Sequence, residues 1–335
     1  MITTEIFDLT VIGGGPVGLF GATMAGLHGM KVKIIETLTD LGGQLHALYP
    51  EKPIYDVPGF PAVMAKDLVR ALITQMRRYG PVICTRESVE SVTSKDGVYW
   101  LHTDKETHGS RAILLAVGIG SFTPRKLPAI GADDYENRGL YYFVPELQHF
   151  SDQRVLVVGG GDTAVDWALS ISQHARHVDL VHRRNEFRAL QESVRQLLQT
   201  PNITVHTPCQ LTEILGDDAK ITGAVLSSQP KRIIKVDCII GALGFHPDLG
   251  PIKRWDLDMV DGNIKVSLDT MATTRPGIFA VGDGISYPGK VKLIATGFGE
   301  VGIAIAQIRS YLHPELKGLP HSSNLKPSKM VAEIP

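Results

Sequence analysis

Two glycine-rich turns carry the residue types and spacings that point most directly to chemistry. Each follows an apolar run: "LTVIGGGPVGLFGATMA" at 9–25 and "VLVVGGGDTAVDWAL" at 155–169. In a turn between a strand and a helix, the first glycine permits the tight bend and the second lets the backbone approach a pyrophosphate. The third lets the helix pack closely on the strand. Both turns are therefore predicted to bind dinucleotides.

The first turn has the full G-x-G-x-x-G pattern, and an acid ends the strand that follows it. This acid, Glu36, is placed to accept hydrogen bonds from ribose hydroxyls. A glycine pattern alone is a weak signal, but strand, turn, helix, strand and acid together are specific for a dinucleotide site. The predicted site at this turn comprises Gly13, Gly15, Pro16, Val17, Gly18 and Glu36.

The second turn has the variant pattern G-x-G-x-x-A, and the strand after it ends in "HRRNEFR" rather than in an acid. Guanidinium groups suit the 2′-phosphate of NADP, whereas an acid suits the free 2′-hydroxyl of NAD. The arginines therefore predict an NADPH site, with a solvated basic loop as the alternative. The predicted residues are Gly159, Gly161, Asp162, Thr163, Ala164, His182, Arg183, Arg184 and Arg188.

Two turns with different ribose chemistry suggest two different nucleotides. Hydride that enters from NADPH must leave through the occupant of the first turn, and a flavin accepts two electrons and releases them singly or together. FAD is therefore the expected occupant of the first turn, and the protein is expected to be an oxidoreductase. A non-catalytic nucleotide-sensing protein stays open as an alternative, and it requires that FAD be absent.

The overall composition excludes several other classes of protein. The 335 residues carry a formal net charge of −1, so no general attraction to nucleic acid or to an anionic membrane is expected. No apolar run approaches the roughly 20 residues that span a bilayer, and no signal peptide is recognisable. We expect a cytoplasmic protein. The three cysteines, Cys84, Cys209 and Cys238, lack metal-ligand or C-x-x-C spacing, so we predict buried thiols and no metal site.

Repeated strand–helix–strand patterns position both turns. The first turn lies between a strand at 6–12 and a helix at 16–29, and the second lies between a strand at 154–158 and a helix at 162–175. The sequence thus predicts an α/β protein with two Rossmann-like, three-layer nucleotide-binding domains. Further strands are predicted at 31–36, 82–92, 97–103, 111–120, 177–182, 203–206, 221–227 and 236–244, and further helices at 65–79 and 297–312.

The chain resembles the thioredoxin-reductase-like flavoproteins over nearly its whole length. The resemblance rests on the two turns, on "AVG" at 116–118, on "HRR" after the second turn, and on "GIFAVGD" ending at Asp283. It implies an NADPH-binding domain at 118–246, inserted into an FAD-binding domain made of 1–117 and 247–335. Within the latter, residues 313–335 would form a C-terminal extension over the flavin.

Departures from that family indicate a subfamily. Thioredoxin reductases carry a redox C-x-x-C where this chain has Phe143 and Glu146, so disulfide chemistry through an enzyme dithiol is excluded. Bacillithiol-disulfide reductases carry a cysteine in the first turn, where this chain has Val17. The segment "GGQLHALYPEKPIYDVPGFP" at 42–61 instead resembles the thioredoxin-reductase-like ferredoxin–NADP(+) reductases. That resemblance implies hydride transfer from NADPH to FAD, then single-electron transfer to ferredoxin or flavodoxin, or the reverse.

The same resemblance implies roles for residues outside the glycine turns. Tyr49 and His321 would cover the two faces of the flavin ring, with His321 supplied by the partner in a homodimer. No acid–base catalyst is implied, because hydride transfer needs positioned rings. An NAD(P)H oxidase or a quinone or flavin reductase of the same fold stays open. The other implied FAD residues are Gln44, Val89, Phe122, Asp283, Thr296, Ser322 and Ser323.

Overall fold

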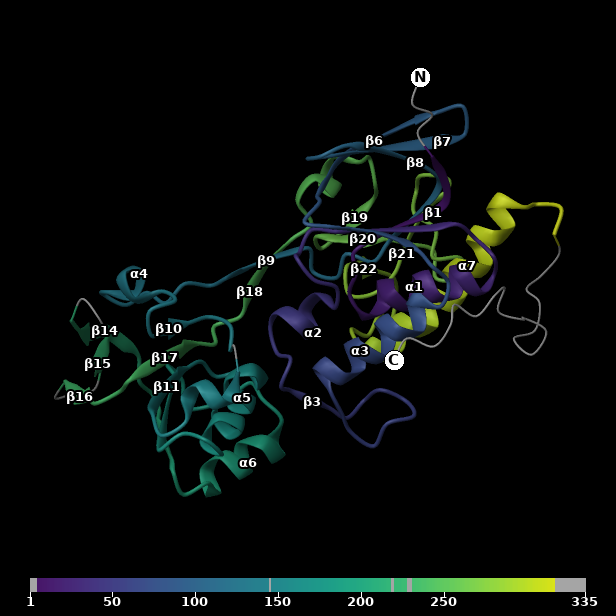
Figure 1. Cartoon of the computed structure of the whole chain (residues 1–335). Helices are drawn as coiled ribbons and strands as arrows, with labels where there is room; N and C mark the ends of the chain where they lie inside the picture. Colours follow the sequence, from purple (N-terminus) through teal and green to yellow (C-terminus); the bar gives the residue numbers. More distant parts are fainter. Residues whose placement is uncertain (1–4, 145, 218–219, 228–230, 317–335) are drawn as a thin grey trace. The chain divides into compact units, whose positions relative to one another are not determined.

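The computed structural model describes residues 5–144, 146–217, 220–227 and 231–316, which form two compact units (Figure 1). The first unit combines the chain up to Ser121 with the chain from Pro247, and the second unit is Phe122–His246. Strands β9 (Ser121–Pro124) and β18 (Phe245–Asp248) form a two-stranded sheet where the chain crosses from one unit to the other. The second unit is thus an insertion in the first.

The first unit is built on a sheet with parallel strands at its centre. Its path runs β5 (Val82–Thr85), β2 (Val32–Glu36), β1 (Ile6–Ile12), β8 (Thr107–Leu115), β7 (Val98–Thr103) and β6 (Val89–Lys95), and β21 (Ile278–Ala280) also pairs with β8. Strands β5, β2, β1, β8 and β21 are parallel, whereas β8, β7 and β6 pair antiparallel. Leu9, Val11 and Leu114 are fully buried, as expected for strands covered on both faces.

Three helices pack together in the first unit. Helix α1 (Pro16–Leu27) contacts both α3 (Ala65–Arg77) and α7 (Ile294–Leu312). Phe20 of α1 and Phe298 of α7 lie with ring centroids 4.9 Å apart. This packing fixes the position of α1, which begins directly after the first glycine turn. The short elements of this unit are α2 (Gly43–Ala47), β3 (Pro53–Ile54), β4 (Val63–Met64), η2 (Gly250–Arg254), β19 (Met259–Val260), β20 (Asn263–Lys265) and β22 (Ile285–Ser286).

The second unit repeats the strand–turn–helix arrangement around its own sheet. The order is β10 (Leu140–Tyr141), β17 (Cys238–Gly241), β11 (Arg154–Val158), β12 (His177–Val181) and β13 (Ile203–His206), all parallel. Its helices are α4 (Ala132–Tyr135), α5 (Asp162–Ser172), α6 (Gln191–Gln199) and the 3-10 turn η1 (Leu147–Phe150). An antiparallel sheet of β14 (Leu211–Gly216), β15 (Ile221–Leu226) and β16 (Arg232–Ile234) completes the unit.

Several sequence-based boundaries are wrong in informative ways. The predicted strand at 82–92 is two strands, because Arg86 has a left-handed backbone (φ 54°) that interrupts the run between β5 and β6. The predicted strand at 111–120 begins earlier and ends at Leu115, and the helix predicted from 297 begins at Ile294. Helix α6 was not predicted. No helix in the described part of the chain is both long and apolar enough to cross a membrane.

Candidate functional site

The backbone of the first glycine turn passes through space that only glycine can occupy. A Cβ atom on Gly13 would lie 2.4 Å from the carbonyl oxygen of Ala116, and one on Gly18 would lie 1.9 Å from that of Gly13. A Cβ on Gly15, by contrast, would meet only the Cα of Gly43, at 3.9 Å. The first and third glycines therefore serve packing, and the second leaves one side of the turn open for close approach of a ligand.

Glu36, the predicted ribose acid, is aimed back at this turn. Its Oε2 accepts a hydrogen bond from the amide of Gly14 at 2.7 Å, and its Oε1 accepts one from the amide of Leu38 at 2.9 Å. The Gly15 cap of α1 contributes no side-chain hydrogen bond, and Pro16 has no N–H, so the donors at this helix end are the amides that follow Pro16. An open turn at a helix N-terminus, beside an oriented carboxylate, fits the pyrophosphate and ribose of a dinucleotide.

Two further segments of the first unit meet at the start of α1. The side chain of Val17 faces both Gly282 and Gly297: a Cβ added on Gly282 would lie 3.6 Å from its Cγ1, and one on Gly297 would lie 2.5 Å from its Cγ2. Asp283 follows Gly282, and Thr296 precedes Gly297 in the first turn of α7. Predicted FAD residues from three distant parts of the sequence therefore lie around one helix end. Burial raises the pKa of Asp283, against the opposing effect of Lys290 and Lys292.

Tyr49 and Gln44 lie in the same region of the first unit. Burial raises the pKa of Tyr49 to about 12, and the negative charge of Asp283 contributes to the shift. The phenol is therefore neutral at any physiological pH. The side chain of Gln44 lies close to Gly118, since a Cβ added on Gly118 would be 3.3 Å from Nε2 of Gln44. The segment 42–49 thus approaches the "AVG" segment that follows β8.

Sequence reasoning missed a buried carboxylate in α7. Glu300 is 3% exposed, and its Oε2 accepts a hydrogen bond from the amide of Gly282 at 2.7 Å. Its Oε1 accepts hydrogen bonds from the hydroxyl of Tyr287 at 2.7 Å and from the ammonium of Lys290 at 2.5 Å. Glu300 thereby holds Gly282, the residue before Asp283, in place. An acid within the otherwise apolar run of α7 is the one feature of the sequence that marks this residue, and its partners become visible only in the fold.

The second glycine turn repeats the packing of the first. A Cβ on Gly159 would lie 2.4 Å from the carbonyl oxygen of Ala242, whereas one on Gly161 would meet only the carbonyl oxygen of Arg188, at 3.8 Å. Ala164, at the third position, is fully buried. The Gly161 cap of α5 also contributes no side-chain hydrogen bond. This turn therefore has the same open side as the first, and α5, like α1, begins without a side-chain cap.

The segment after β12 folds back over the second turn. The imidazole of His182 lies over Gly160, where an added Cβ would be 2.2 Å from the ring, and it stacks on Phe187 with centroids 5.4 Å apart. The amide of Arg188 donates to the carbonyl oxygen of Gly160 at 2.7 Å. The amide of Leu190 donates to Oδ1 of Asp162 at 2.9 Å. Sequence reasoning identified the arginines but not these backbone contacts, which pin the loop to the turn.

The arginines of this loop are exposed and surround His182. Burial lowers the pKa of His182, and the positive charges of Arg183, Arg184 and Arg188 lower it further. Three exposed arginines on the loop that is bonded to this turn concentrate positive charge, which suits an anion, in a protein whose net charge is near zero. Thr163 is exposed in the first turn of α5.

The other predicted site residues lie away from the two glycine turns or outside the residues that the structure describes. Val89 is buried at the start of β6. His321, Ser322 and Ser323 lie outside the described residues, as does the side chain of Phe122. Phe143 stacks on Phe245 with centroids 5.5 Å apart, where thioredoxin reductases have a redox cysteine. Cys84, Cys209 and Cys238 are all free thiols.

Known proteins of similar sequence and structure place the chain in a family. Residues 7–300 match the family described as pyridine nucleotide-disulphide oxidoreductase. A ferredoxin–NADP reductase of Geobacillus thermodenitrificans is 48% identical over 326 residues, covering 96% of this chain and 98% of the relative. Ferredoxin–NADP reductase 2 of Bacillus subtilis is 46% identical over 331 residues, covering 97% and 99%.

Solved thioredoxin reductases share the fold. The enzyme of Lactococcus lactis matches with a TM-score of 0.78 at 26% identity, covering 92% of this chain and all of that chain. The enzyme of T. acidophilum matches with a TM-score of 0.79 at 24% identity, covering 91% and 98%. The predicted α/β class with two Rossmann-like domains is confirmed. The chain therefore belongs to the pyridine nucleotide-disulphide oxidoreductase family, on the branch that holds these ferredoxin–NADP reductases.

Proposed function

We propose that this protein is an FAD-dependent ferredoxin–NADP reductase, which passes hydride from NADPH to FAD and then single electrons to ferredoxin, or runs in reverse. The observation that carries the proposal is the pair of open glycine turns with opposite ribose chemistry, Glu36 beside one and an arginine loop beside the other. The relatives at 46–48% identity over nearly the whole chain bear this name.

FAD is assigned to the first unit. Its pyrophosphate would lie against the amides that follow Pro16 in the first turn of α1, and its ribose against Glu36. Asp283, held beside the Glu300 anchor, would contact the ribityl or pyrophosphate region, and the α7 N-terminus near Thr296 would face the flavin. Tyr49 would cover one face of the ring. The remaining FAD residues of the proposal are Gln44, Val89 and Phe122, with His321, Ser322 and Ser323 in the extension.

NADPH is assigned to the second unit. Its pyrophosphate would lie on the open side of the turn at Gly161, and its 2′-phosphate among Arg183, Arg184 and Arg188. Because the loop is fastened to Gly160 and Asp162 at Arg188 and Leu190, the backbone that carries the arginines is held near the turn before the nucleotide arrives. Such preorganisation reduces the ordering cost of binding.

The protein contributes positioning to this reaction rather than acid–base chemistry. When bound, FAD supplies the two-electron to one-electron conversion. Tyr49 is proposed to act as a ring, and burial, which raises its pKa to about 12, further disfavours ionisation of its phenol. Phe143 and Glu146 leave no dithiol beside the nucleotide sites, which separates this chemistry from disulfide reduction.

The physiological setting is part of the proposal. Ferredoxin is the expected electron carrier, and flavodoxin is an alternative carrier of the same kind. We place the enzyme in the cytoplasm as a homodimer, in which residues 313–335 of one subunit cover the flavin of the other.

NADPH-driven reduction of cytochrome c, measured with and without added ferredoxin, tests the function. The account expects a yellow protein in which ferredoxin multiplies the rate of cytochrome reduction and NADPH is preferred over NADH. Oxygen uptake that equals the ferredoxin-dependent rate would favour an NAD(P)H oxidase, and equally fast reduction of a disulfide partner would exclude the electron-transfer function. A colourless protein that binds nucleotides without turnover would favour a sensing role.

A further inference from the structure

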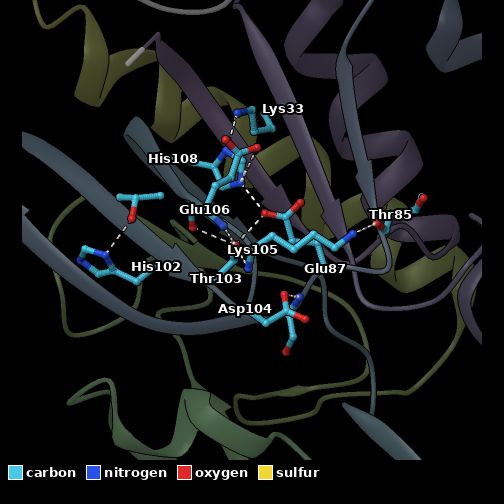
Figure 2. A network of polar contacts seen from close by, with 11 residues as sticks. Lys33, Thr85, Glu87, His102, Thr103, Asp104, Lys105, Glu106 and His108 are labelled. Carbon is cyan, nitrogen blue, oxygen red and sulfur yellow. Dashed lines mark hydrogen bonds and ion pairs between the residues drawn. The ribbon is translucent and has the colours of Figure 1, made fainter. Parts of the chain in front are cut away.

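A buried polar network in the first unit has no part in the proposed reaction. Lys33 of β2, His108 of β8 and Glu87, between β5 and β6, are 8%, 2% and 4% exposed. Nζ of Lys33 lies 2.6 Å from Nδ1 of His108, and Nε2 of His108 lies 2.6 Å from Oε1 of Glu87. The hydroxyl of Thr103 donates to the same oxygen at 2.7 Å. Figure 2 shows these side chains converging from strands β2, β7 and β8 and from the segment between β5 and β6.

The hydrogen bonds define one arrangement of charge. An ammonium group can only donate, so Nδ1 of His108 must accept from Lys33 and Nε2–H must donate to Glu87. A neutral imidazole therefore links a buried cation to a buried anion. Burial alone would raise the pKa of Glu87, but the hydrogen bonds from His108 and Thr103 outweigh it and lower the pKa. The carboxylate is thus charged, and its Oε1 accepts both hydrogen bonds.

The same glutamate is tied through its backbone to the proposed ribose acid. The amide of Glu87 donates to the carbonyl oxygen of Glu36 at 3.1 Å, and the amide of Arg86 donates to that of Leu38 at 2.9 Å. Arg86 has the left-handed backbone that interrupts the strand. The segment 86–88 therefore bridges the end of β2 and the hairpin of β7 and β8, to which Ser88 is also bonded through Asp104 at 2.8 Å.

Metal binding explains this cluster less well. Polar atoms of Cys84, Glu87 and His108 do lie within 4.8 Å of one another. The 2.6 Å contact between Glu87 and His108 is, however, a hydrogen bond, and two ligands on one tetrahedral zinc would be roughly 3.3 Å apart. The ammonium of Lys33 on the other nitrogen of His108 would also repel a cation. The contacts describe an anchor for the segment.

We propose that Glu87 is a positioning residue for the adenosine end of the FAD site, an inference that rests on the proposed function. Its buried side chain holds the segment 86–88 against Glu36, and through it the Glu36 carboxylate in line with the glycine turn. Val89, a predicted FAD residue, begins the strand directly beyond this segment. Loss of the Glu87 side chain would therefore allow Glu36 to move, while the residues around the flavin ring would stay unchanged.

The experiment compares Glu87→Ala and Glu87→Gln with the unaltered protein. Apoprotein is titrated with FAD and, separately, with ADP, which carries only the adenosine and diphosphate portion, at a temperature where every variant is folded. Asp179→Asn serves as the matched control, because it disrupts a buried acid–histidine contact in the other unit, between Asp179 and His206 at 2.6 Å. Thermal unfolding is recorded for each variant.

Glu87→Ala is expected to weaken FAD and ADP binding alike, each by about tenfold, the effect of losing one hydrogen bond to a charged group. Glu87→Gln keeps an acceptor oxygen and should weaken both by about threefold, since neutral hydrogen bonds are about half as strong. Asp179→Asn should leave both dissociation constants unchanged.

A lowered unfolding temperature with unchanged FAD and ADP constants would overturn the inference, because a purely structural role predicts that pattern. If Glu87→Ala does not fold, unchanged constants in Glu87→Gln overturn it equally. An unaltered protein that binds no FAD would instead refute the proposed function, so the two failures are distinguishable.

Discussion

The two glycine turns are built alike and differ in what covers their middle glycine. Added Cβ atoms on Gly13 and Gly159 would each lie 2.4 Å from a carbonyl oxygen of the neighbouring strand end. The amides of these two glycines donate to Ile35 and Val181, at 2.9 and 3.0 Å. Beside Gly14, however, lie a methyl group of Leu41 and the carboxylate of Glu36, whereas over Gly160 lies the imidazole of His182. One backbone device thus serves both units, and the residue ending the next strand selects the nucleotide.

The contrast extends into the interior of the two sheets. Lys33 and Asp179 stand at matching places, each three residues before the residue that covers the turn. Both are buried, and each contacts a histidine of another strand, His108 or His206, at 2.6 Å. The buried residue at this place is a lysine in the first unit, where it is linked through His108 to the buried acid Glu87, and an aspartate in the second unit. The two sheets therefore place residues of opposite charge type at the same point of the repeated pattern.

The largest change in stability and cofactor binding is expected at the third position of the glycine pattern, which is Gly18 in the first turn and Ala164 in the second. In Gly18→Ala, the new Cβ would lie 1.9 Å from a backbone oxygen, so we expect loss of bound FAD and destabilisation by about 4 kcal/mol or more. Ala164→Gly should cost the second unit only about 1 kcal/mol. Flavin absorbance and thermal unfolding check both variants. A yellow Gly18→Ala protein of normal stability would break the comparison.

Glu36→Gln tests the acidic turn. The carboxylate accepts two backbone hydrogen bonds and is proposed to accept a ribose hydroxyl. Loss of its charge should weaken FAD binding between about tenfold and hundredfold, at 1.5–3 kcal/mol for a charge-assisted hydrogen bond. Flavin fluorescence on titration of the apoprotein measures the change. An unchanged dissociation constant would remove Glu36 from the FAD site.

Alanine at two neighbouring glycines should separate the roles within the basic turn. Gly160→Ala pushes the His182 ring and its arginine loop away, so the Michaelis constant for NADPH should rise about tenfold, the effect of one displaced phosphate contact. NADH, which lacks the 2′-phosphate, should be affected less. Gly161→Ala narrows the open side of the turn and should raise both constants alike. Steady-state kinetics of both variants with NADPH and with NADH measure these Michaelis constants. Identical changes in the two variants would contradict the separate roles of the two glycines.

The smallest effect concerns the pH dependence of stability. His182 has a lowered pKa in the folded protein. At pH values below 6.5, the ordinary pKa of histidine, the folded state therefore binds fewer protons than the unfolded state. Its contribution to stability is therefore complete above pH 6.5 and declines as the pH falls towards the folded pKa. His182→Gln should show a shallower fall in unfolding temperature between pH 7.5 and 5.5. An identical fall in both proteins would show that His182 does not titrate in this way.

Strands and site residues that form a recognisable local sequence pattern could be predicted, whereas contacts made by backbone groups could not. Strands 6–12, 154–158 and 203–206 match the structure, because apolar runs stopped by glycine or proline define them. The left-handed Arg86 carries no sequence signal. The pinning of the arginine loop also escaped prediction, since the amide of Arg188 and the carbonyl of Gly160 are groups that every residue has. The Glu300 anchor needed the meeting of α7 with Gly282, which only the tertiary fold provides.

The central claim is that the arginine loop, in place of an acid, makes the second turn an NADPH site. The direct measurement is the ratio of kcat/KM for NADPH to that for NADH in the double variant Arg183→Ala, Arg184→Ala. Loss of two charge-assisted phosphate contacts should lower this ratio about a hundredfold, at roughly 1.4 kcal/mol for each factor of ten. Activity with NADH should change little. An equal loss with both nucleotides would contradict the claim.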